Sequence, residues 1–338
     1  MELFFERDQV IALCPSHRSV FVFQLFRYLR KDLSTIIHSL SSPNKCDITH
    51  YAWQELTSED KKYAAIHLNE TDETRKNAIK EIKRWIKEND NLPAQIDNFL
   101  ILQFLRVDKF DLEKTKYRIR NYYKHRSNVP EWYSSKDPFQ PELQEILNLG
   151  IFLPLRKPDS QGRTVYLVRA ARHDPRIHKI SNLAKICAMA LDAAMKYNVA
   201  GSVYGYTWYV DVSNVTARHI FQLTPSTLKN LVDTWQKCYP LRYQKIVLFN
   251  VPMIFDIVVR ILRSFMTQKL KNRFYVCSHE NCFEEIPTDG LPVEYGGTGE
   301  TIQELTEFWK KFIEDNRDWL TKDENNQIIQ TTEPTEDF

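Results

Sequence analysis

After residue 160, strand-like and helix-like sequence patterns alternate regularly, and this alternation most constrains what the chain can fold into. Short runs of β-branched and aromatic residues occupy 163–169, 204–212, 243–249 and 273–278. Helical patterns fall between and after them, at 183–197, 225–239, 252–271 and 302–320. Strands that alternate with helices usually pair side by side in parallel, with each helix as the crossover. The sequence therefore predicts the α/β class with a mainly parallel sheet.

The chain before this region has a different pattern and predicts helices without strands. Residues 58–126 are rich in Lys and Glu, and Ile79, Ile82, Trp85 and Ile86 form an apolar stripe at helical spacing. Asp97 is a suitable N-cap for a second helix. We therefore expect an N-terminal helical bundle, which a proline-rich connector at 129–141 joins to the α/β part.

These patterns divide the chain into five parts. We expect an N-terminal extension of weak pattern at 1–45, to which we assign no role, and the helical module at 46–128. The α/β domain follows at 129–300, a closing helix at 301–321, and an acidic tail without regular structure at 322–338.

Composition excludes several classes of partner and places the protein in the cytoplasm. The net charge of +2 gives no general attraction to nucleic acid. No apolar run approaches the roughly 20 residues of a membrane-spanning helix, so any membrane contact should be peripheral. The six cysteines form no CxxC pair, which favours a reducing compartment. We expect a monomer.

The sequence contains no recognisable catalytic, cofactor or metal motif. There is no GxSxG elbow, and the glycine cluster 296–299 does not open a helix after a strand. His173 and His219 are isolated in the sequence. Cys277, His279 and Cys282 supply three ligands where a closed zinc site needs four, so ordinary buried thiols are favoured. We therefore expect no enzyme, no cofactor and no metal.

The helix expected at 252–271 is amphipathic and allows two interpretations. Its apolar face contains residues at i, i+3, i+7 and i+11, namely Phe255, Val258, Leu262 and Met266. Basic residues crowd its end, and 241–273 contains seven Lys and Arg against one acid. Periodicity alone favours a surface helix that packs on the sheet. The alternative is a movable helix whose apolar face enters lipid while its basic residues contact anionic headgroups.

Several ordered motifs resemble the CRAL-TRIO lipid-binding family. They are Leu100–Asp111, Asn121–Arg126, Tyr239-Pro240, Asn250–Pro252 and Leu291–Gly297, and the resemblance spans about 74–320. Within the family it is closest to the branch that contains tocopherol carriers, retinaldehyde carriers and clavesin. It implies an apolar lipid cavity on the sheet, closed by residues 252–271 as a mobile gate.

The resemblance and strand alternation together suggest which side chains bind the ligand. Phe255, Val258, Leu262 and Met266 would be the gate's inner face. The expected wall consists of Tyr166, Val168, Met189, Trp208, Val210, Phe221, Ile246 and Leu248, although ordinary core packing is an equal alternative for each. These segments contain no cationic cluster, so a neutral isoprenoid such as a tocopherol, retinoid or carotenoid is favoured over a phospholipid.

The resemblance also implies a basic cleft for phosphoinositide headgroups beside the gate. Arg242, Lys269 and Arg273 match three of its basic positions. Gln244 and Asp108 stand where arginines are expected, and Lys109 is a possible substitute next to Asp108. Anionic membranes that contain phosphoinositide are thus expected partners, with weaker binding or a different headgroup preference.

Three functions remain open from the sequence. The first is a carrier that transfers a small hydrophobic ligand between membranes, with release assisted by phosphoinositide. The second is a phosphoinositide-binding adaptor of endosomal traffic, whose bound lipid is structural. The third, an isomerase or hydrolase of the bound lipid, lacks any nucleophile–base motif.

Overall fold

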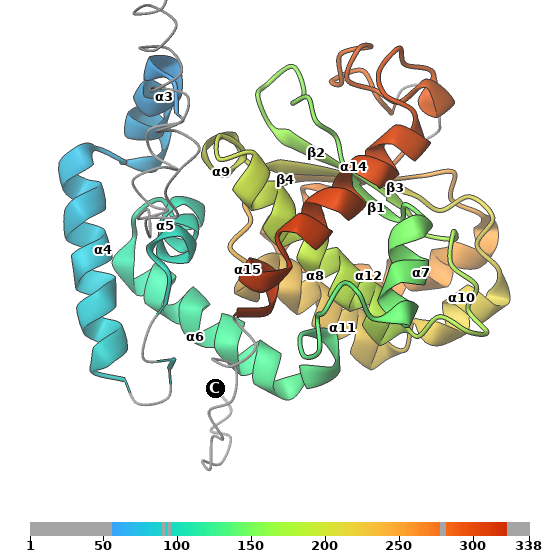
Figure 1. Cartoon of the computed structure of the whole chain (residues 1–338), viewed down its shortest axis with the longest axis horizontal. Coiled ribbons are helices and arrows are strands. Elements are labelled where there is room, and N and C mark those ends of the chain that lie inside the picture. Colours follow the sequence, from blue (N-terminus) through green and yellow to red (C-terminus); the bar gives the residue numbers. More distant parts are fainter. Residues whose placement is uncertain (1–55, 90–91, 94–95, 278–281, 323–338) are drawn as a thin grey trace, which may run out of the picture. The chain divides into compact units, whose positions relative to one another are not determined.

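The structure of the protein is a computed structural model, which describes residues 56–89, 92–93, 96–277 and 282–322 (Figure 1). All of these residues belong to one compact unit of the chain. The expected extension at 1–45 and nearly all of the expected tail at 322–338 lie outside the described residues.

Four helices form the N-terminal module and confirm the predicted helical bundle. They are α3 (Ser58–Leu68), α4 (Asp72–Lys87), α5 (Asn98–Val107) and α6 (Leu112–Asn128). Their starts are capped by side chains: Thr57 and Asp60 form a capping box on α3, and Asp97 accepts from the backbone N–H of Phe99 on α5. Buried apolar residues of α4 include Ile82, Trp85 and Ile86, three of the four in the predicted stripe.

A five-stranded, mainly parallel sheet confirms the predicted α/β class. Its strands are β1 (Phe152–Pro154), β2 (Thr164–Arg169), β3 (Tyr206–Asp211), β4 (Tyr243–Phe249) and β5 (Phe274–Cys277), paired in that order. β2 to β5 are parallel, whereas β1 pairs antiparallel with β2 at the edge. Sequence reasoning missed β1, because three residues are too few to establish a period.

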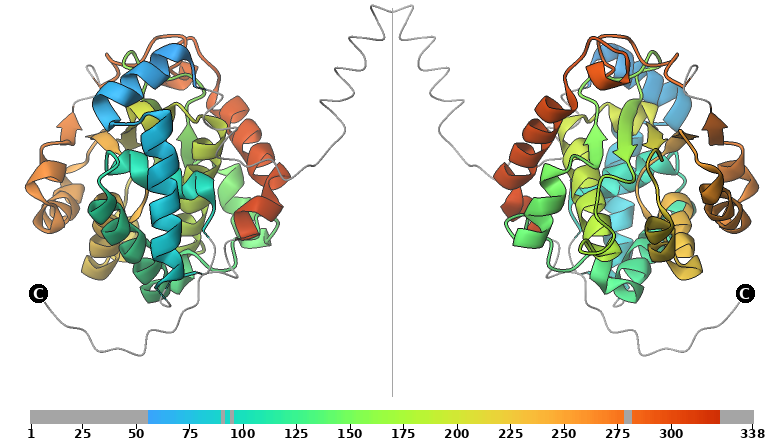
Figure 2. Two further views of the ribbon diagram at one scale, coloured as in Figure 1. Left: turned by 90° about the vertical axis from the view of Figure 1, so that its left-hand side faces the viewer. Right: turned by 90° about the vertical axis from the view of Figure 1, so that its right-hand side faces the viewer.

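Helices connect the strands and cover the sheet. They are α7 (Pro141–Asn148), α8 (Ile180–Tyr197), α9 (Gly201–Tyr204), α10 (Ala217–Gln222), α11 (Pro225–Asp233), α12 (Asp256–Phe265), α13 (Gln268–Lys271), α14 (Ile302–Asp315) and α15 (Arg317–Lys322). In Figure 1, α8, α11 and α12 lie below the strands. Figure 2 shows α14 and α15 at one edge and β5 at the opposite edge.

Two of the predicted helices are interrupted. The segment expected as one helix at 252–271 consists of a 3₁₀ turn (Met253–Phe255), α12 and α13. Met266 is extended, with ψ of 138°, and Thr267 begins a new helix as its N-cap. The closing helix expected at 302–320 likewise changes direction at Asn316. Helical periodicity continues across both breaks, which is why the sequence did not show them.

A buried arginine joins the helical module to the α/β domain and is neutralised by an ion pair within the module. Arg106 on α5 donates from Nε and Nη2 to the carboxylate of Glu70, at 2.9 and 3.0 Å. Its Nη1 donates to Ser202 Oγ on α9 at 2.6 Å. Both charged side chains are fully buried, so each depends on the other for the interactions that water would otherwise provide.

We expect Arg106→Met to lower the free energy of unfolding by about 3–5 kcal/mol, because it leaves the buried carboxylate of Glu70 unpaired. Arg84→Met is the matched control, since Arg84 pairs with Glu81 at the exposed surface of α4 and should change stability little. Urea unfolding measures both. Equal midpoints for the two variants would contradict the role of the buried pair.

Candidate functional site

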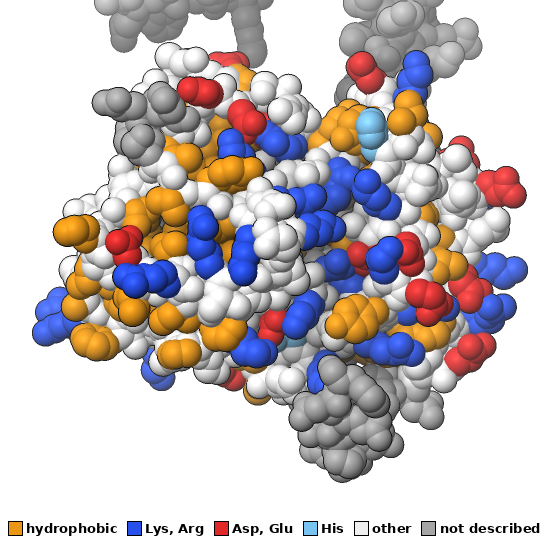
Figure 3. Space-filling model, turned by 180° about the vertical axis from the view of Figure 1, so that it is seen from behind, with side chains coloured by type: hydrophobic (Ala, Val, Ile, Leu, Met, Phe, Trp, Pro, Cys, Tyr) orange, Lys and Arg blue, Asp and Glu red, His pale blue; other side chains and the backbone are white. Residues whose placement is uncertain are grey.

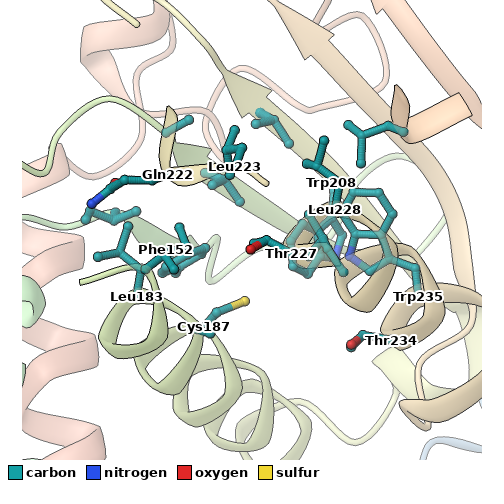
Figure 4. A pocket seen from close by; sticks show the side chains of 18 of the residues that line it. Phe152, Leu183, Cys187, Trp208, Gln222, Leu223, Thr227, Leu228, Thr234 and Trp235 are labelled. Atoms are coloured by element: carbon teal, nitrogen blue, oxygen red, sulfur yellow. The ribbon is translucent and has the colours of Figure 1, made fainter. Parts of the chain in front are cut away.

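An apolar cavity of about 220 Å³ lies against one face of the sheet. Strands β2, β3 and β4 contribute Val168, Trp208, Val210 and Leu248 to its wall. Helix α8 contributes one continuous face, spaced i, i+3, i+4, i+7, i+8 and i+11: Ile180, Leu183, Ala184, Cys187, Ala188 and Leu191. In Figure 4 the side chains of Cys187 and Thr227 point into the space between these elements. Cavities of this composition bind small, mostly apolar molecules.

Helix α12 and the turn before it close the cavity and are apolar on two sides. Phe255, Val258 and Leu262 line the cavity and are buried. On the outer side Met253, Ile254 and Ile257 are 84%, 48% and 52% exposed. Large exposed apolar side chains grouped together commonly mark a surface that contacts a membrane or another protein.

The structure brings seven of the twelve expected ligand-binding residues to the cavity wall. They are Val168, Trp208, Val210, Leu248, Phe255, Val258 and Leu262. The other five lie elsewhere. Tyr166 and Ile246 lie directly beside Trp208 on β2 and β4, but only Trp208 of these three lines the cavity. Met189 is buried on roughly the opposite side of α8 from Cys187.

Met266 and Phe221 also lie outside the cavity wall, for different reasons. Met266 follows the end of α12, where the extended backbone directs it away from the helix's inner face, and it is buried. Phe221 on α10 is 81% exposed, because the α10 residues that line the cavity are His219 and Gln222. Family position alone had suggested Phe221, and it cannot specify the facing of so short a helix.

Sequence reasoning missed a polar end of the cavity formed by His173, His219 and Gln222. The two imidazole ring centroids are 4.8 Å apart, and both rings line the cavity. His173 Nε2 pairs with Gln222 Oε1 at 2.9 Å, while His219 Nε2 pairs with the carbonyl of His173 at 3.1 Å. Burial lowers the pKa of His173, which favours its neutral form. Only the fold joins residues so far apart in sequence.

Tyr243 is a second residue of the wall that sequence reasoning missed. It opposes Tyr206 on β3, and the next pair joins Thr207 to Lys245, so β4 has one extra residue at this point. Such a bulge redirects the side chains that precede it. Simple alternation back from Leu248 and Ile246 would have put Gln244, rather than Tyr243, toward the cavity.

The four expected phosphoinositide-binding residues form a basic cluster beside α13. Lys269 interacts electrostatically with Arg273 and Lys109, and Arg273 with Arg242. Burial, and then the charge of Arg273, lower the pKa of Lys269. Figure 3 shows Lys and Arg side chains gathered near the middle of one face of the molecule, with exposed hydrophobic side chains beside them.

Arg118 belongs to this basic cluster and was not predicted. It lies on α6 and binds both carboxylate oxygens of Asp108, at 2.8 and 2.9 Å. Its charge also contributes to the lowered pKa of Lys269. The acidic residue at a position where an arginine was expected is therefore neutralised by an arginine from the next helix.

The described residues include no group of three or more His, Cys, Asp or Glu side chains arranged to hold a metal ion. In the part of the chain that the structure describes, Cys277 and Cys282 form no disulfide, and His279 lies outside that part. Burial raises the pKa of Cys282 to about 11. Within the same part of the chain, each helix is too short or too polar to span a bilayer.

Comparison with protein families identifies the α/β domain. Residues 148–297 match the family model of the CRAL/TRIO domain, and residues 71–143 match the model described as Pinta-like, UBA domain. Residues 148–297 are therefore a CRAL-TRIO domain, which confirms the resemblance seen in the sequence.

Curated relatives agree with this assignment. The chain is 26% identical over 239 residues to the human "Alpha-tocopherol transfer protein-like", a match covering 70% of this chain and 68% of that protein. It is 24% identical over 245 residues to Clavesin-2 of Rattus norvegicus, covering 72% and 75%. The crystal structure of Sfh5 matches with a TM-score of 0.42 at 13% identity, covering 70% of this chain and 92% of that one.

We expect the free energy of unfolding to fall as the pH drops below about 6.5, because burial lowers the pKa of both His125 and His173. Just below that pH the unfolded chain binds more protons than the folded protein, so acid favours unfolding. Urea unfolding at about pH 7.5 and 5.5 measures the change. His125→Gln and His173→Gln should each reduce it, and His67→Gln, at an exposed position, should not. An unchanged pH dependence in both buried variants would contradict this.

Proposed function

We propose that this protein binds a small, neutral isoprenoid in the cavity and transfers it between membranes from the cytoplasm. The observation that carries the proposal is an apolar cavity closed by a helix that is apolar on both its inner and its outer side. The alpha-tocopherol transfer protein-like relative supports the same class of activity. The cavity residue Thr234 lies 2.9 Å from His125 Nε2, but its hydroxyl donates to the carbonyl of Asn230, which disfavours an enzyme that uses it as a nucleophile.

In this proposal α12 and the preceding turn are the gate. Opening into water would expose Phe255, Val258 and Leu262, and each such side chain loses about 1.5–3 kcal/mol when it leaves an apolar environment. Opening into lipid removes most of that cost, because hydrocarbon replaces the lost contacts. Met253, Ile254 and Ile257 are already exposed and would enter the membrane first. The gate would then open only at a membrane surface.

The basic cluster would hold the gate against anionic lipid. Its four predicted members contribute positive charge next to α13, which follows the gate in the chain, while Arg118 neutralises the nearby Asp108. A polyphosphorylated headgroup such as that of a phosphoinositide matches several cations at once. Headgroup binding would therefore favour the open gate and ligand release.

A second function, the phosphoinositide-binding adaptor of endosomal traffic, is favoured by the same basic cluster and by the similarity to Clavesin-2. An adaptor binds membranes but does not need to move its lipid. Transfer of ligand between two vesicle populations therefore separates the two functions.

We expect purified protein to move α-tocopherol or retinaldehyde from donor to acceptor vesicles, measured by fluorescence transfer. Ile257→Asp should reduce the transfer rate about tenfold or more while ligand binding persists, because a charge on the outer side opposes entry into hydrocarbon. Ile66→Asp, at another exposed apolar position on α3, is the control. Membrane binding without transfer would favour the adaptor, and full transfer by Ile257→Asp would reject the gate.

Charge reversal in the basic cluster should weaken binding to vesicles that contain phosphoinositide. Lys269→Glu should lower vesicle affinity several-fold and reduce its dependence on salt, because one attractive charge is lost and a repulsive one added. Lys83→Glu on the exposed surface of α4 makes the same charge change away from the cluster. Vesicle sedimentation at two salt concentrations measures both. Equal effects of the two variants would show that net charge, rather than the cluster, governs binding.

A further inference from the structure

Two buried hydrogen-bond donors have no partner among the described residues. They lie at the end of the cavity that is nearest the starts of β3 and β4. They are the indole Nε1 of Trp208 and the hydroxyl of Tyr243. Each side chain is only 4% exposed, and both line the cavity. Buried polar groups in folded proteins nearly always have a partner, so an unpaired pair beside a cavity points to something that the cavity holds.

Most of the other polar side chains of the cavity wall have partners. His173, His219 and Gln222 form a closed network at the opposite end. Thr234 Oγ1 donates to the carbonyl of Asn230. Thr227 pairs with Thr224, and Tyr239 with Asp192. The polar side chains at one end of the cavity are therefore hydrogen-bonded to other protein groups, whereas the two donors at the other end are not.

The unpaired donors lie in an aromatic cluster built on the starts of β3 and β4. The ring centroids of Trp208 and Tyr243 are 5.8 Å apart, and Trp235 lies 6.3 and 6.5 Å from them. Figure 4 shows Trp208 and Trp235 at one end of the pocket and Gln222 toward the other. Because the β4 bulge turns Tyr243 onto the same face as Trp208, donors from adjacent strands serve one end of the cavity.

We infer that Trp208 Nε1 and the Tyr243 hydroxyl bind the polar head of the ligand, and that this head is a neutral hydrogen-bond acceptor. The inference rests on the proposed function and specifies its ligand class. An indole N–H can only donate, so the head must offer a lone pair, as a carbonyl, ether or hydroxyl oxygen does. The apolar body then extends along α8 toward Leu183 and Leu223.

An anionic head is disfavoured at this end. The cavity wall contains no Lys or Arg among the described residues, and its histidines are engaged at the opposite end. A buried carboxylate or phosphate without a cation is costly, even where two donors solvate it. A neutral terminal oxygen needs only those donors.

The test compares three probes with one polyene skeleton: all-trans-retinaldehyde, all-trans-retinoic acid, and the matching hydrocarbon that lacks oxygen. Binding to the full chain is followed by quenching of tryptophan fluorescence. We expect retinaldehyde to bind best. Tyr243→Phe should weaken retinaldehyde about three- to tenfold, the worth of one hydrogen bond, and leave the hydrocarbon unchanged. Tyr166→Phe is the matched control, because its hydroxyl is equally buried and unpaired but does not line the cavity.

The possible outcomes separate this inference from the proposed function. Retinaldehyde binding that depends on the Tyr243 hydroxyl but not on that of Tyr166 supports both. Equal binding of aldehyde and hydrocarbon, or equal effects of the two variants, overturns the inference and leaves the carrier function standing. Retinoic acid binding as tightly as the aldehyde overturns the neutral head. If none of these probes and no α-tocopherol binds, the carrier function itself falls, and the inference with it.

Discussion

An apolar cavity lowers the free energy of unfolding, and the packing around it must compensate for this loss. At about 24 cal/mol per Å³, a cavity of 220 Å³ corresponds to roughly 5 kcal/mol. That is similar to the entire net stability of many domains. The walls must therefore be held apart by something stronger than their own packing. Here the parallel sheet forms one wall, and α8, α11 and α12 are fixed around it by the connections between strands.

The same constraint explains why the two halves of the chain are tied together. The helical module contacts the α/β domain through α6 and the π-helical turn at Thr234–Cys238, and through the fully buried Arg106 between Glu70 and Ser202. Arg273 of the basic cluster in turn donates from Nη1 to the backbone carbonyl of Tyr243, at 2.5 Å. The residue whose ring closes one end of the cavity is thus in direct contact with the basic cluster.

Sequence periodicity predicted those parts of the fold that repeat along the chain. The strand expected at 243–249 matches β4, and three of the four residues expected on the inner face of the 252–271 helix, Phe255, Val258 and Leu262, line the cavity. The missed features depend on contacts between distant residues. His173 and His219 are 46 positions apart, and neither has a local signal. Arg118 could have been suspected only by asking what neutralises Asp108. Phe221 shows the converse error, because a family position does not determine which side of a short helix faces inward.

The bulge in β4 also changes how the chemistry of this wall is encoded. If β4 paired with β3 without its extra residue, alternation would turn Gln244 toward the cavity and Tyr243 away from it. The group at this point is therefore set by whether the bulge forms, as well as by which residues are present. A change that abolished the bulge would exchange a phenol for an amide while leaving both Tyr243 and Gln244 in the sequence. In an alignment made by residue type alone, one column would then contain side chains that face the cavity in some related chains and face away from it in others.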